Sequence, residues 1–209
     1  MKMWMVKILA VAGGLAFMAS ASNAQNLITN GTFEADPPPV GLGYNPASGW
    51  LGGGFGTFPG NRGLRNDAMS FSGNYYHLNE AGGFQVGVSQ VFAMPGVGNL
   101  SVSGLYASRD IATGNNSFVV QVLDGTTNTL LHQASFNPTA LGNWTAFNVL
   151  TPSISASTVR VLFIAQANGF DDDYMIDNLT ANATPEPGAV ALLALAVVPG
   201  VAVLRRRNK

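Results

Sequence analysis

Few side chains in this sequence are suited to covalent or acid–base catalysis. The 209-residue chain has no cysteine and only two histidines, which removes thiol chemistry and cysteine metal sites. Neither His77 nor His132 belongs to a motif with a spaced serine or a second metal ligand. We interpret both as ordinary strand histidines and predict no catalytic residue and no enzymatic activity. An exported hydrolase is a weaker alternative, because the many acidic residues offer carboxylate pairs without favouring any one pair.

Aromatic rings and arginines give a more specific prediction. The stretch 36–67 is rich in glycine and proline and carries Phe55, Phe58, Arg62 and Arg65. An aromatic ring can stack on the apolar face of a sugar, and a guanidinium donates directed hydrogen bonds to sugar oxygens. Long loops in compact domains are often functional, so we predict that these four residues bind ligand. Other candidates share this side-chain chemistry: Trp50, Tyr75, Tyr76, Tyr106 and Arg109.

The charged residues are unevenly distributed along the chain. Residues 25–183 hold four arginines, no lysine and ten acidic residues, a net charge of −6, although the whole chain has a net charge of −1. A lysine-free acidic domain is a poor match for nucleic acid, so we predict no nucleic-acid partner. Such a domain can host calcium, which prefers oxygen ligands. The simpler alternative is an acidic surface that only keeps the protein soluble.

The first 24 residues are typical of a secretory signal peptide. Lys2 and Lys7 lead into an apolar stretch, and Ser22-Asn23-Ala24 provides a small-x-small cleavage site. We therefore expect a signal-peptide helix over residues 1–24 and an exported protein. Residues 25–183 then form one domain, which is long enough to bury a core without disulfides.

Residues 184–209 have the composition of a membrane-sorting tail. Pro185-Glu186-Pro187 is followed by about 16 mostly apolar residues and then by Arg205-Arg206-Arg207. As a helix, about 16 residues span roughly 24 Å, which predicts a short transmembrane helix with a basic cytoplasmic stop. A buried helix of a globular domain is the disfavoured alternative, because apolar residues surround the segment rather than lining one face.

This tail resembles the PEP-CTERM sorting signal of bacterial surface proteins. The resemblance implies an exosortase-like sorting enzyme as a partner, and anchoring in the inner membrane only until the tail is processed. It also implies a final location on the cell surface or in the extracellular matrix of a Gram-negative bacterium.

The middle of the chain alternates apolar and polar residues with the period of β-strands. The clearest alternation covers residues 84–89, 100–106 and 117–122. Residues 158–166 are apolar on both faces, which predicts a central strand. Turns rich in glycine, asparagine, proline and aspartate separate these runs. The pattern predicts an all-β fold, a two-sheet sandwich or jelly roll, with residues 36–67 as a long loop between the first strand and the body.

Five elements resemble those of galactose-binding-like jelly rolls, the fold of many carbohydrate-binding modules. In chain order they are residues 26–34 (NLITNGTFE), 48–50 (SGW), 89–92 (SQVF), 141–147 (LGNWTAF) and 173–179 (DYMIDNL). In that family the first and last of these are the opening and closing strands. The likeness covers residues 26–181 in the correct order, and it implies a jelly-roll β-sandwich in which Trp50 and Trp144 are core residues.

The same resemblance implies a structural calcium ion. Modules of this family commonly hold calcium near the first and last strands, where Glu34 and Asp177 occupy the matching positions. Two carboxylates brought together repel unless a cation lies between them, and backbone carbonyls can complete the ligand set. The alternative is two exposed carboxylates at a sheet end. The consecutive aspartates 171–173 cannot all face one ion from a strand, so we interpret them as a solvated acidic turn.

These observations predict an exported, non-catalytic surface or matrix protein with a sugar-binding or adhesive jelly roll. Extracellular polysaccharide is the expected partner. Neutral glycans are the expected class, since a net charge of −6 opposes an anionic polymer at long range. The alternative function is a purely structural exopolymer component without a specific ligand.

Overall fold

The computed structural model describes residues 25–37, 47–54, 62–79, 85–109, 117–137, 139–166 and 173–185. The predicted signal peptide, Phe55, Phe58 and the sorting tail from Glu186 onward lie outside these residues. Within them the protein is all-β, as predicted, with ten strands in two antiparallel sheets. Among the residues that the structure describes, no helix has the length and apolar character of a membrane span.

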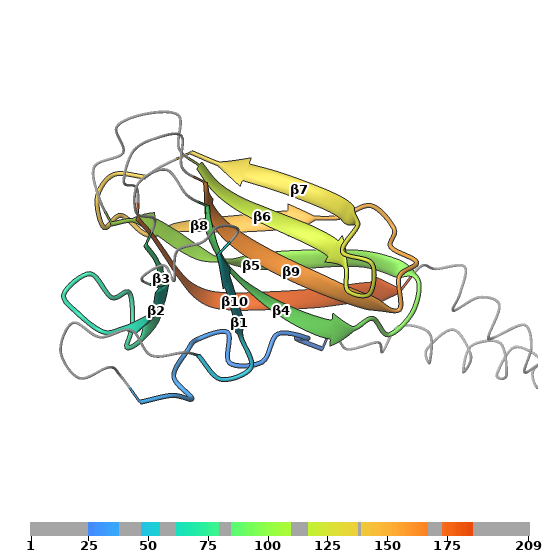
Figure 1. Ribbon diagram of the computed structural model, residues 1–209, viewed down its shortest axis with the longest axis horizontal. Coiled ribbons are helices and arrows are strands. Elements are labelled where there is room, and N and C mark those ends of the chain that lie inside the picture. Colours follow the sequence, from blue (N-terminus) through green and yellow to red (C-terminus); the bar gives the residue numbers. More distant parts are fainter. Residues whose placement is uncertain are drawn as a thin grey trace, which may run out of the picture.

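The two sheets pack face to face as a sandwich (Figure 1). The β9 sheet, named after its central strand, contains in spatial order β1 (Leu51–Gly54), β4 (Val86–Ala93), β9 (Thr158–Gln166), β6 (Ser117–Asp124) and β7 (Leu130–Phe136). The β10 sheet contains in order β2 (Arg62–Arg65), β3 (Tyr75–Leu78), β10 (Tyr174–Pro185), β5 (Gly98–Ser108) and β8 (Thr145–Leu150). The chain crosses repeatedly between the sheets, which is the connectivity of a jelly-roll sandwich.

The strands form where the sequence alternates. In β6, Phe118 and Val120 pack in the core between the sheets. β9 is the middle strand of its sheet and is buried on both faces, with Phe163 in the core and Leu162 in a separate apolar cluster on the outside. The prediction of a central strand over residues 158–166 is therefore confirmed.

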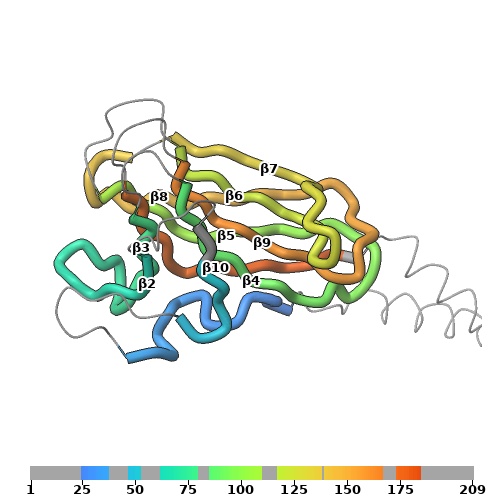
Figure 2. The backbone as a smooth tube through the Cα atoms, viewed as in Figure 1, coloured from blue at the N-terminus to red at the C-terminus, as the bar shows by residue number. Residues whose placement is uncertain are grey.

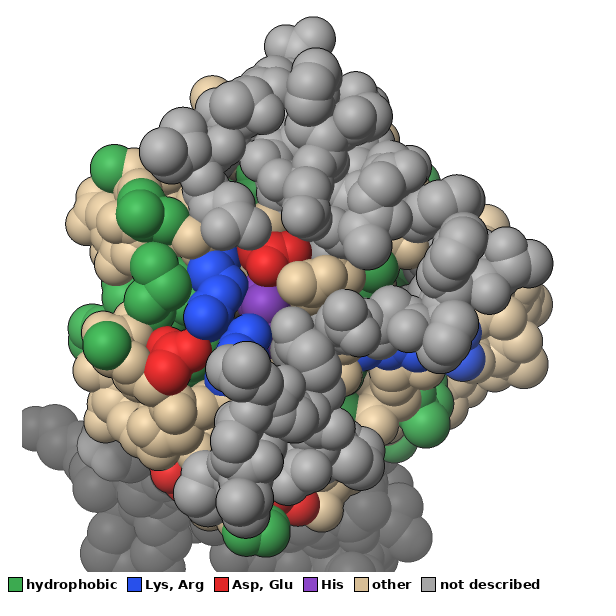
Figure 3. Space-filling model, turned by 60° about the vertical axis from the view of Figure 1, so that its left-hand side comes forward, with side chains coloured by type: hydrophobic (Ala, Val, Ile, Leu, Met, Phe, Trp, Pro, Cys, Tyr) green, Lys and Arg blue, Asp and Glu red, His purple; other side chains and the backbone are tan. Residues whose placement is uncertain are grey.

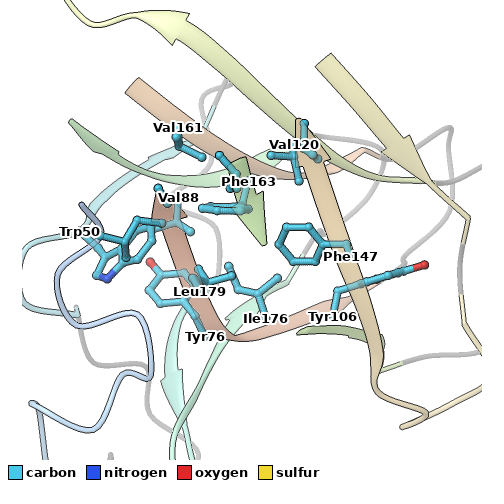
Figure 4. Packing of buried hydrophobic residues seen from close by; sticks show 14 of the residues in the cluster. Trp50, Tyr76, Val88, Tyr106, Val120, Phe147, Val161, Phe163, Ile176 and Leu179 are labelled. Atoms are coloured by element: carbon cyan, nitrogen blue, oxygen red, sulfur yellow. The ribbon is translucent and has the colours of Figure 1, made fainter. Parts of the chain in front are cut away.

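Aromatic rings fill much of the core (Figure 4). Phe118 stacks on Tyr106 and Phe163 with ring centroids 5.0 and 6.3 Å apart. Trp50 lies at one end of this core, 5.4 Å from the ring of Phe33, and is 7% exposed, which confirms its predicted core position. Buried aromatic rings contribute large apolar areas, so this sandwich is stabilised without disulfide bonds.

Residues 26–34 do not form the predicted opening strand. Apart from one bridge between Asn26 and Asn182, they turn, with φ of 50° at Asn30 and 60° at Phe33. Positive φ belongs to the left-handed region, which interrupts an extended strand. The turn buries the ring of Phe33 completely and leaves the next residue, Glu34, exposed.

This N-terminal segment joins the two sheets along one side of the sandwich (Figure 2). The Leu27 N–H donates to the Ala181 carbonyl of β10 at 2.7 Å. The side chain of Gln90 on β4 accepts from the Thr29 N–H at 2.8 Å and donates to the Thr29 carbonyl at 3.0 Å. One buried glutamine thus satisfies both backbone groups of Thr29, which lies outside any strand.

The stretch 36–67, predicted as one long loop, contains β1 and β2. β1 reads Leu-Gly-Gly-Gly and pairs with β4, and Arg62 of β2 crosses closely over Gly52. A Cβ atom at Gly52 would lie 2.7 Å from the Arg62 Nε, so a larger residue there would displace the Arg62 side chain. A strand so rich in glycine lacks the alternating side chains from which a strand is predicted.

Candidate functional site

The outer face of the β10 sheet brings together polar and aromatic side chains from distant parts of the chain. Tyr76 and Ile176 pack in the core, so their neighbours Tyr75, His77 and Asp177 face the outer side of the sheet. Figure 3 shows basic, acidic and histidine side chains gathered at this end of the molecule, with hydrophobic side chains beside them.

Residues 66–73, which connect β2 to β3, form a turn over this face. Asp67 organises the turn, because its Oδ1 accepts from the Met69 N–H at 3.0 Å and its carbonyl accepts from the Ser70 N–H at 3.0 Å. Such an aspartate turn is a common way for a short polar side chain to replace a backbone partner. The Met69 carbonyl accepts a 2.9 Å hydrogen bond from the indole of Trp144, which fixes the turn to the start of β8.

The other carboxylate oxygen of Asp67 joins three side chains. Its Oδ2 accepts from the Tyr75 hydroxyl at 3.0 Å and from Arg109 at 2.9 Å, and it lies 3.8 Å from the Nε of Arg65. Arg109 also donates to the Tyr75 hydroxyl. Burial would raise the pKa of Asp67, but the Met69 N–H and Arg109 outweigh it and hold that pKa below its usual value. The carboxylate is therefore ionised and holds both arginines in place.

A row of aromatic rings lies beside this polar group. Phe71 is 55% exposed, and its ring stands edge-on to Trp144 with centroids 6.1 Å apart. Trp144 in turn stands edge-on to Tyr75 at 6.1 Å. Trp144 was predicted to be a core residue, but it does not lie between the sheets. It is half-buried on the outer face against Tyr75, Met69 and Met175. Its side chain points outward because it continues β8 on the side opposite to the buried Phe147.

His77 forms the buried centre of the same face. Its Nε2 lies 2.9 Å from the Asp173 carboxylate, and its Nδ1 lies 3.5 Å from the Arg65 guanidinium. Burial lowers the pKa of His77 against the opposing effect of Asp173. The neutral ring then donates from Nε2 to Asp173 and accepts from Arg65 at Nδ1. The predicted strand position of His77 is confirmed, and the histidine also links Asp173 to the Arg65 side chain.

The sequence predicted that Asp173 belongs to a solvated acidic turn, and the structure contradicts this prediction. It is 5% exposed, and its Oδ2 accepts from Asn79 at 3.0 Å as well as from His77. A buried carboxylate is tolerated where several donors surround it. Asp171 and Asp172 lie outside the described residues.

Glu34 and Asp177 lie close enough for the charge of Glu34 to act on Asp177. The Oε1 of Glu34 accepts from the Asn74 N–H at 2.6 Å, and a Cβ atom at Gly73, where φ is 66°, would overlap the Glu34 carboxylate. Asp177 is 1% exposed and accepts from the Asn178 N–H at 2.6 Å, and its Oδ2 has no hydrogen-bond partner in the described part of the chain. Burial, with a smaller contribution from the charge of Glu34, raises the pKa of Asp177 to about 7.

The two carboxylates repel each other, and a hard cation between them would remove this repulsion. The orphaned Oδ2 of Asp177 and the repulsion from Glu34 are what a positive ion would relieve. Among the described residues, no three histidine, cysteine, aspartate or glutamate side chains come together as a metal site. A calcium ion here would thus need backbone carbonyls and water in addition to the two carboxylates.

Comparison with known proteins gives a fold rather than a family. No family model matches the chain, and no curated protein matches it. Solved structures do match. TmCBM61 in complex with β-1,4-galactotriose has 13% identity and a TM-score of 0.57, covering 77% of this chain and 100% of that one. Family 16 Carbohydrate Binding Module-2 has 21% identity and a TM-score of 0.50, covering 75% of this chain and 99% of that one.

An enzyme shares the architecture. The Stig cyclase Fisc from Fischerella sp. TAU has 15% identity and a TM-score of 0.60, covering 78% of this chain and 99% of that one. At such identities these matches show the fold alone, the β-sandwich jelly roll of carbohydrate-binding modules. Function must be argued from the site.

The structure divides the predicted ligand residues. Phe55 and Phe58 lie outside the described residues. Arg65 belongs to the polar group around Asp67, Tyr75 and Arg109, here called the outer-face group. Arg62 lies on the other side of β2, against Gly52 and Tyr76. Of the wider candidates, Arg109 is in the group, and Trp50, Tyr76 and Tyr106 are core residues.

Three residues of this face were missed as ligand candidates: Trp144, which was predicted to lie in the core, Phe71 and Asp67. Phe71 stands alone between serines, and Asp67 reads as one more loop acid. The sequence offered only a weak signal for them, an Asn-Asp turn close after a strand. Their importance depends on contacts with Trp144 and Arg109, which come from other strands.

Proposed function

We propose that this is an exported, non-catalytic surface or matrix protein whose β-sandwich binds carbohydrate on the outer face of the β10 sheet. The binding surface comprises the rings of Phe71 and Trp144 and the adjoining polar groups of Asp67, Arg65 and Arg109. The bound glycan is a neutral one, because the ion pairs cancel much of the arginine charge and the domain carries net negative charge.

The observation that carries this proposal is the exposed ring of Phe71, supported edge-on by Trp144 beside the Asp67–Arg109 pair. A sugar ring offers an apolar face and a rim of hydroxyl groups, so it needs a flat ring next to fixed polar groups. Asp67 is 30% and Arg109 20% exposed, which leaves the pair accessible while its geometry stays fixed. The matches to carbohydrate-binding modules support the same use of the fold.

The chemistry of the face favours binding over catalysis. His77 is fully buried and both of its ring nitrogens have partners, so it is poorly placed to exchange a proton with a substrate. Tyr75 is also buried, and burial raises its pKa far above neutrality. These groups support the surface rather than react at it.

Two further parts of the proposal rest on the sequence. Residues 1–24 direct export, and the Pro185-Glu186-Pro187 tail anchors the protein in the inner membrane until a sorting enzyme removes it. Intact mass spectrometry of the mature protein from a host with such an enzyme is expected to lack residues 205–209. Recovery of the complete tail from the mature surface protein would contradict this part. Calcium between Glu34 and Asp177 is proposed as a structural ion.

Retention of the full chain on neutral polysaccharide affinity gels tests the binding surface. Phe71→Ala is expected to abolish most of the retention without changing the melting temperature, because the ring is largely exposed. Val91→Ala is the matched control, since Val91 is 38% exposed but lies on β4 in the other sheet. If the unaltered protein binds no glycan in a broad array, the alternative of a structural exopolymer component without ligand is favoured. Equal loss in both variants would remove Phe71 from the site.

A further inference from the structure

One flank of the sandwich exposes two open sheet edges. Among the residues that the structure describes, β7 ends the β9 sheet and pairs only with β6, and β8 ends the β10 sheet and pairs only with β5. The two edges lie opposite each other, because Phe136 of β7 and Phe147 of β8 meet across the core with ring centroids 5.6 Å apart. Figure 1 shows β7 as the outermost strand of this flank.

Neither edge carries the features that usually prevent a strand from pairing with another chain. β7 reads LLHQASF and β8 reads TAFNVL, without lysine, arginine, acidic residues or proline. A bulge interrupts β7 at Leu131, but the register with β6 is regular from His132 to Phe136. Leucines on and beside the two strands are exposed: Leu130 by 51%, Leu141 by 52% and Leu150 by 63%.

The opposite flank is protected. There the edges are β1 and β2, each of only four residues. β1 is mostly glycine, and β2 begins and ends with an arginine. Short edges and charged side chains both discourage edge-to-edge pairing. The contrast makes the β7–β8 flank the one that remains open.

We infer that the β7–β8 flank is a self-association surface on which a second copy of this chain pairs antiparallel to itself through β7. A strand edge presents a row of free N–H and C=O groups with which another strand can pair in line. A foreign strand could complete one of the two edges. A second copy, turned about a two-fold axis perpendicular to both sheets, meets β7 with its own β7 and β8 with its own β8.

The regular part of β7 fixes the expected register. With the two-fold axis at Ala134, Gln133 of one copy lies opposite Ser135 of the other, and both side chains face the outside of the sheet. Gln133 already accepts a 2.7 Å hydrogen bond from Gln121 of β6. The pairing therefore extends a polar ladder on the outer face of the β9 sheet.

Paired charges test both the surface and the register. The double variant Gln133→Lys/Ser135→Lys places lysine opposite lysine twice, and is expected to weaken the dimer about tenfold or more. Gln133→Lys/Ser135→Glu places lysine opposite glutamate at the same two positions, and is expected to keep the dimer. Gln121→Lys, one strand farther from the axis, is the control and is expected to change dimerisation little.

Sedimentation velocity of the full chain over a wide concentration range measures these effects. Hydrogen exchange is expected to show concentration-dependent protection of β7 amides in the unaltered protein and none in the double-lysine variant. A protein that stays monomeric at all concentrations would overturn the inference. So would association that is equal in all variants without protection of β7, which would locate the contact elsewhere, such as in the apolar tail. Glycan retention by a monomeric variant would leave the proposed binding function intact.

Discussion

Two groups of acidic residues lie on the outer face of the β10 sheet, and they differ in how their charge is compensated. Asp67 accepts hydrogen bonds from tyrosine and arginine side chains, and Asp173 accepts them from histidine and asparagine side chains. Asp177 is buried as deeply as Asp173, yet it has one backbone donor, an orphaned oxygen, and a second carboxylate, Glu34, close by.

The compensated carboxylates support the surface, whereas the uncompensated pair is the candidate cation site. Where every carboxylate has a partner, the network fixes the turn over residues 66–73 and presents the aromatic rings. Where charge is left uncompensated, the protein carries an energetic cost that a cation can remove.

The largest effect is expected from removing a partner within the compensated group. Asp173→Ala leaves the buried His77 Nε2–H and the Asn79 amide without their acceptor, so we expect a loss of about 3 kcal/mol in the free energy of unfolding. Chemical denaturation followed by circular dichroism measures the change.

Asp124→Ala is the control for this loss. Asp124 accepts from the Thr126 and Thr127 N–H groups in an exposed turn, so its removal is expected to cost only about 1 kcal/mol. Equal losses in the two variants would mean that the His77–Asp173 pair contributes no more to the free energy of unfolding than an exposed turn does.

The strands were the predictable part of this molecule, because alternation is a local property. Residues 117–122 and 158–166 carry it plainly, and the structure places them in β6 and β9. The opening segment failed for a local reason as well. Its apolar residues resemble a strand, but Asn30 and Phe33 adopt positive φ. The Asn30-Gly31 pair is a turn signal that the strand prediction overlooked, whereas positive φ at a phenylalanine is not expected from its residue type.

The outer-face group was beyond prediction because its members come together only through sheet pairing. Asp67, Tyr75 and Arg109 are separated in sequence and meet because β2, β3, β10 and β5 are neighbours in that order. Asp173 was misread for the same reason, since its donors His77 and Asn79 are more than ninety residues away. Arg65 was proposed for its chemistry, from a predicted loop that the structure shows to contain a strand.

Calcium should stabilise the uncompensated site by a comparable amount. A ligand that binds only the native state adds RT ln(1 + [L]/Kd), about 2.7 kcal/mol at a hundredfold excess over Kd. We expect the melting temperature of the chelator-treated protein to rise on adding calcium. Asp177→Asn should remove this response, since the amide cannot supply the charge. Identical melting curves with chelator and with calcium in the unaltered protein would contradict the site.

The pH dependence of the metal-free protein gives a smaller effect of defined sign. The pKa of Asp177 is about 7 in the folded protein, whereas its ordinary value is 3.8. Between these two pH values the folded state retains a proton that the unfolded state has lost. The associated stability is present at low pH and is lost as pH rises through about 7. From pH 6.5 to 8.5 we expect a loss of about 1 kcal/mol.

Calcium and Asp177→Asn should each abolish that loss. Below about pH 6.5 the effect of His77 has the opposite sign, because its lowered pKa means that protonation favours the unfolded state. Denaturation measured at several pH values with chelator separates the two groups. A profile that is flat from pH 6.5 to 8.5 in the metal-free protein would show that Asp177 is already compensated.

The smallest expected effect separates burial from repulsion as the cause of the Asp177 shift. Burial is the larger cause and the charge of Glu34 the smaller, so Glu34→Gln should lower the pKa of Asp177 by less than about one unit. The amide oxygen of glutamine can still accept from the Asn74 N–H, so the turn should persist. Carbon NMR of the Asp177 carboxyl measures the shift in chelator. The same variant should weaken calcium binding by tenfold or more, because it removes one of two charged ligands. A full return of Asp177 to its ordinary pKa would make repulsion the dominant cause, and the two acidic groups would then differ in charge pairing rather than in solvation.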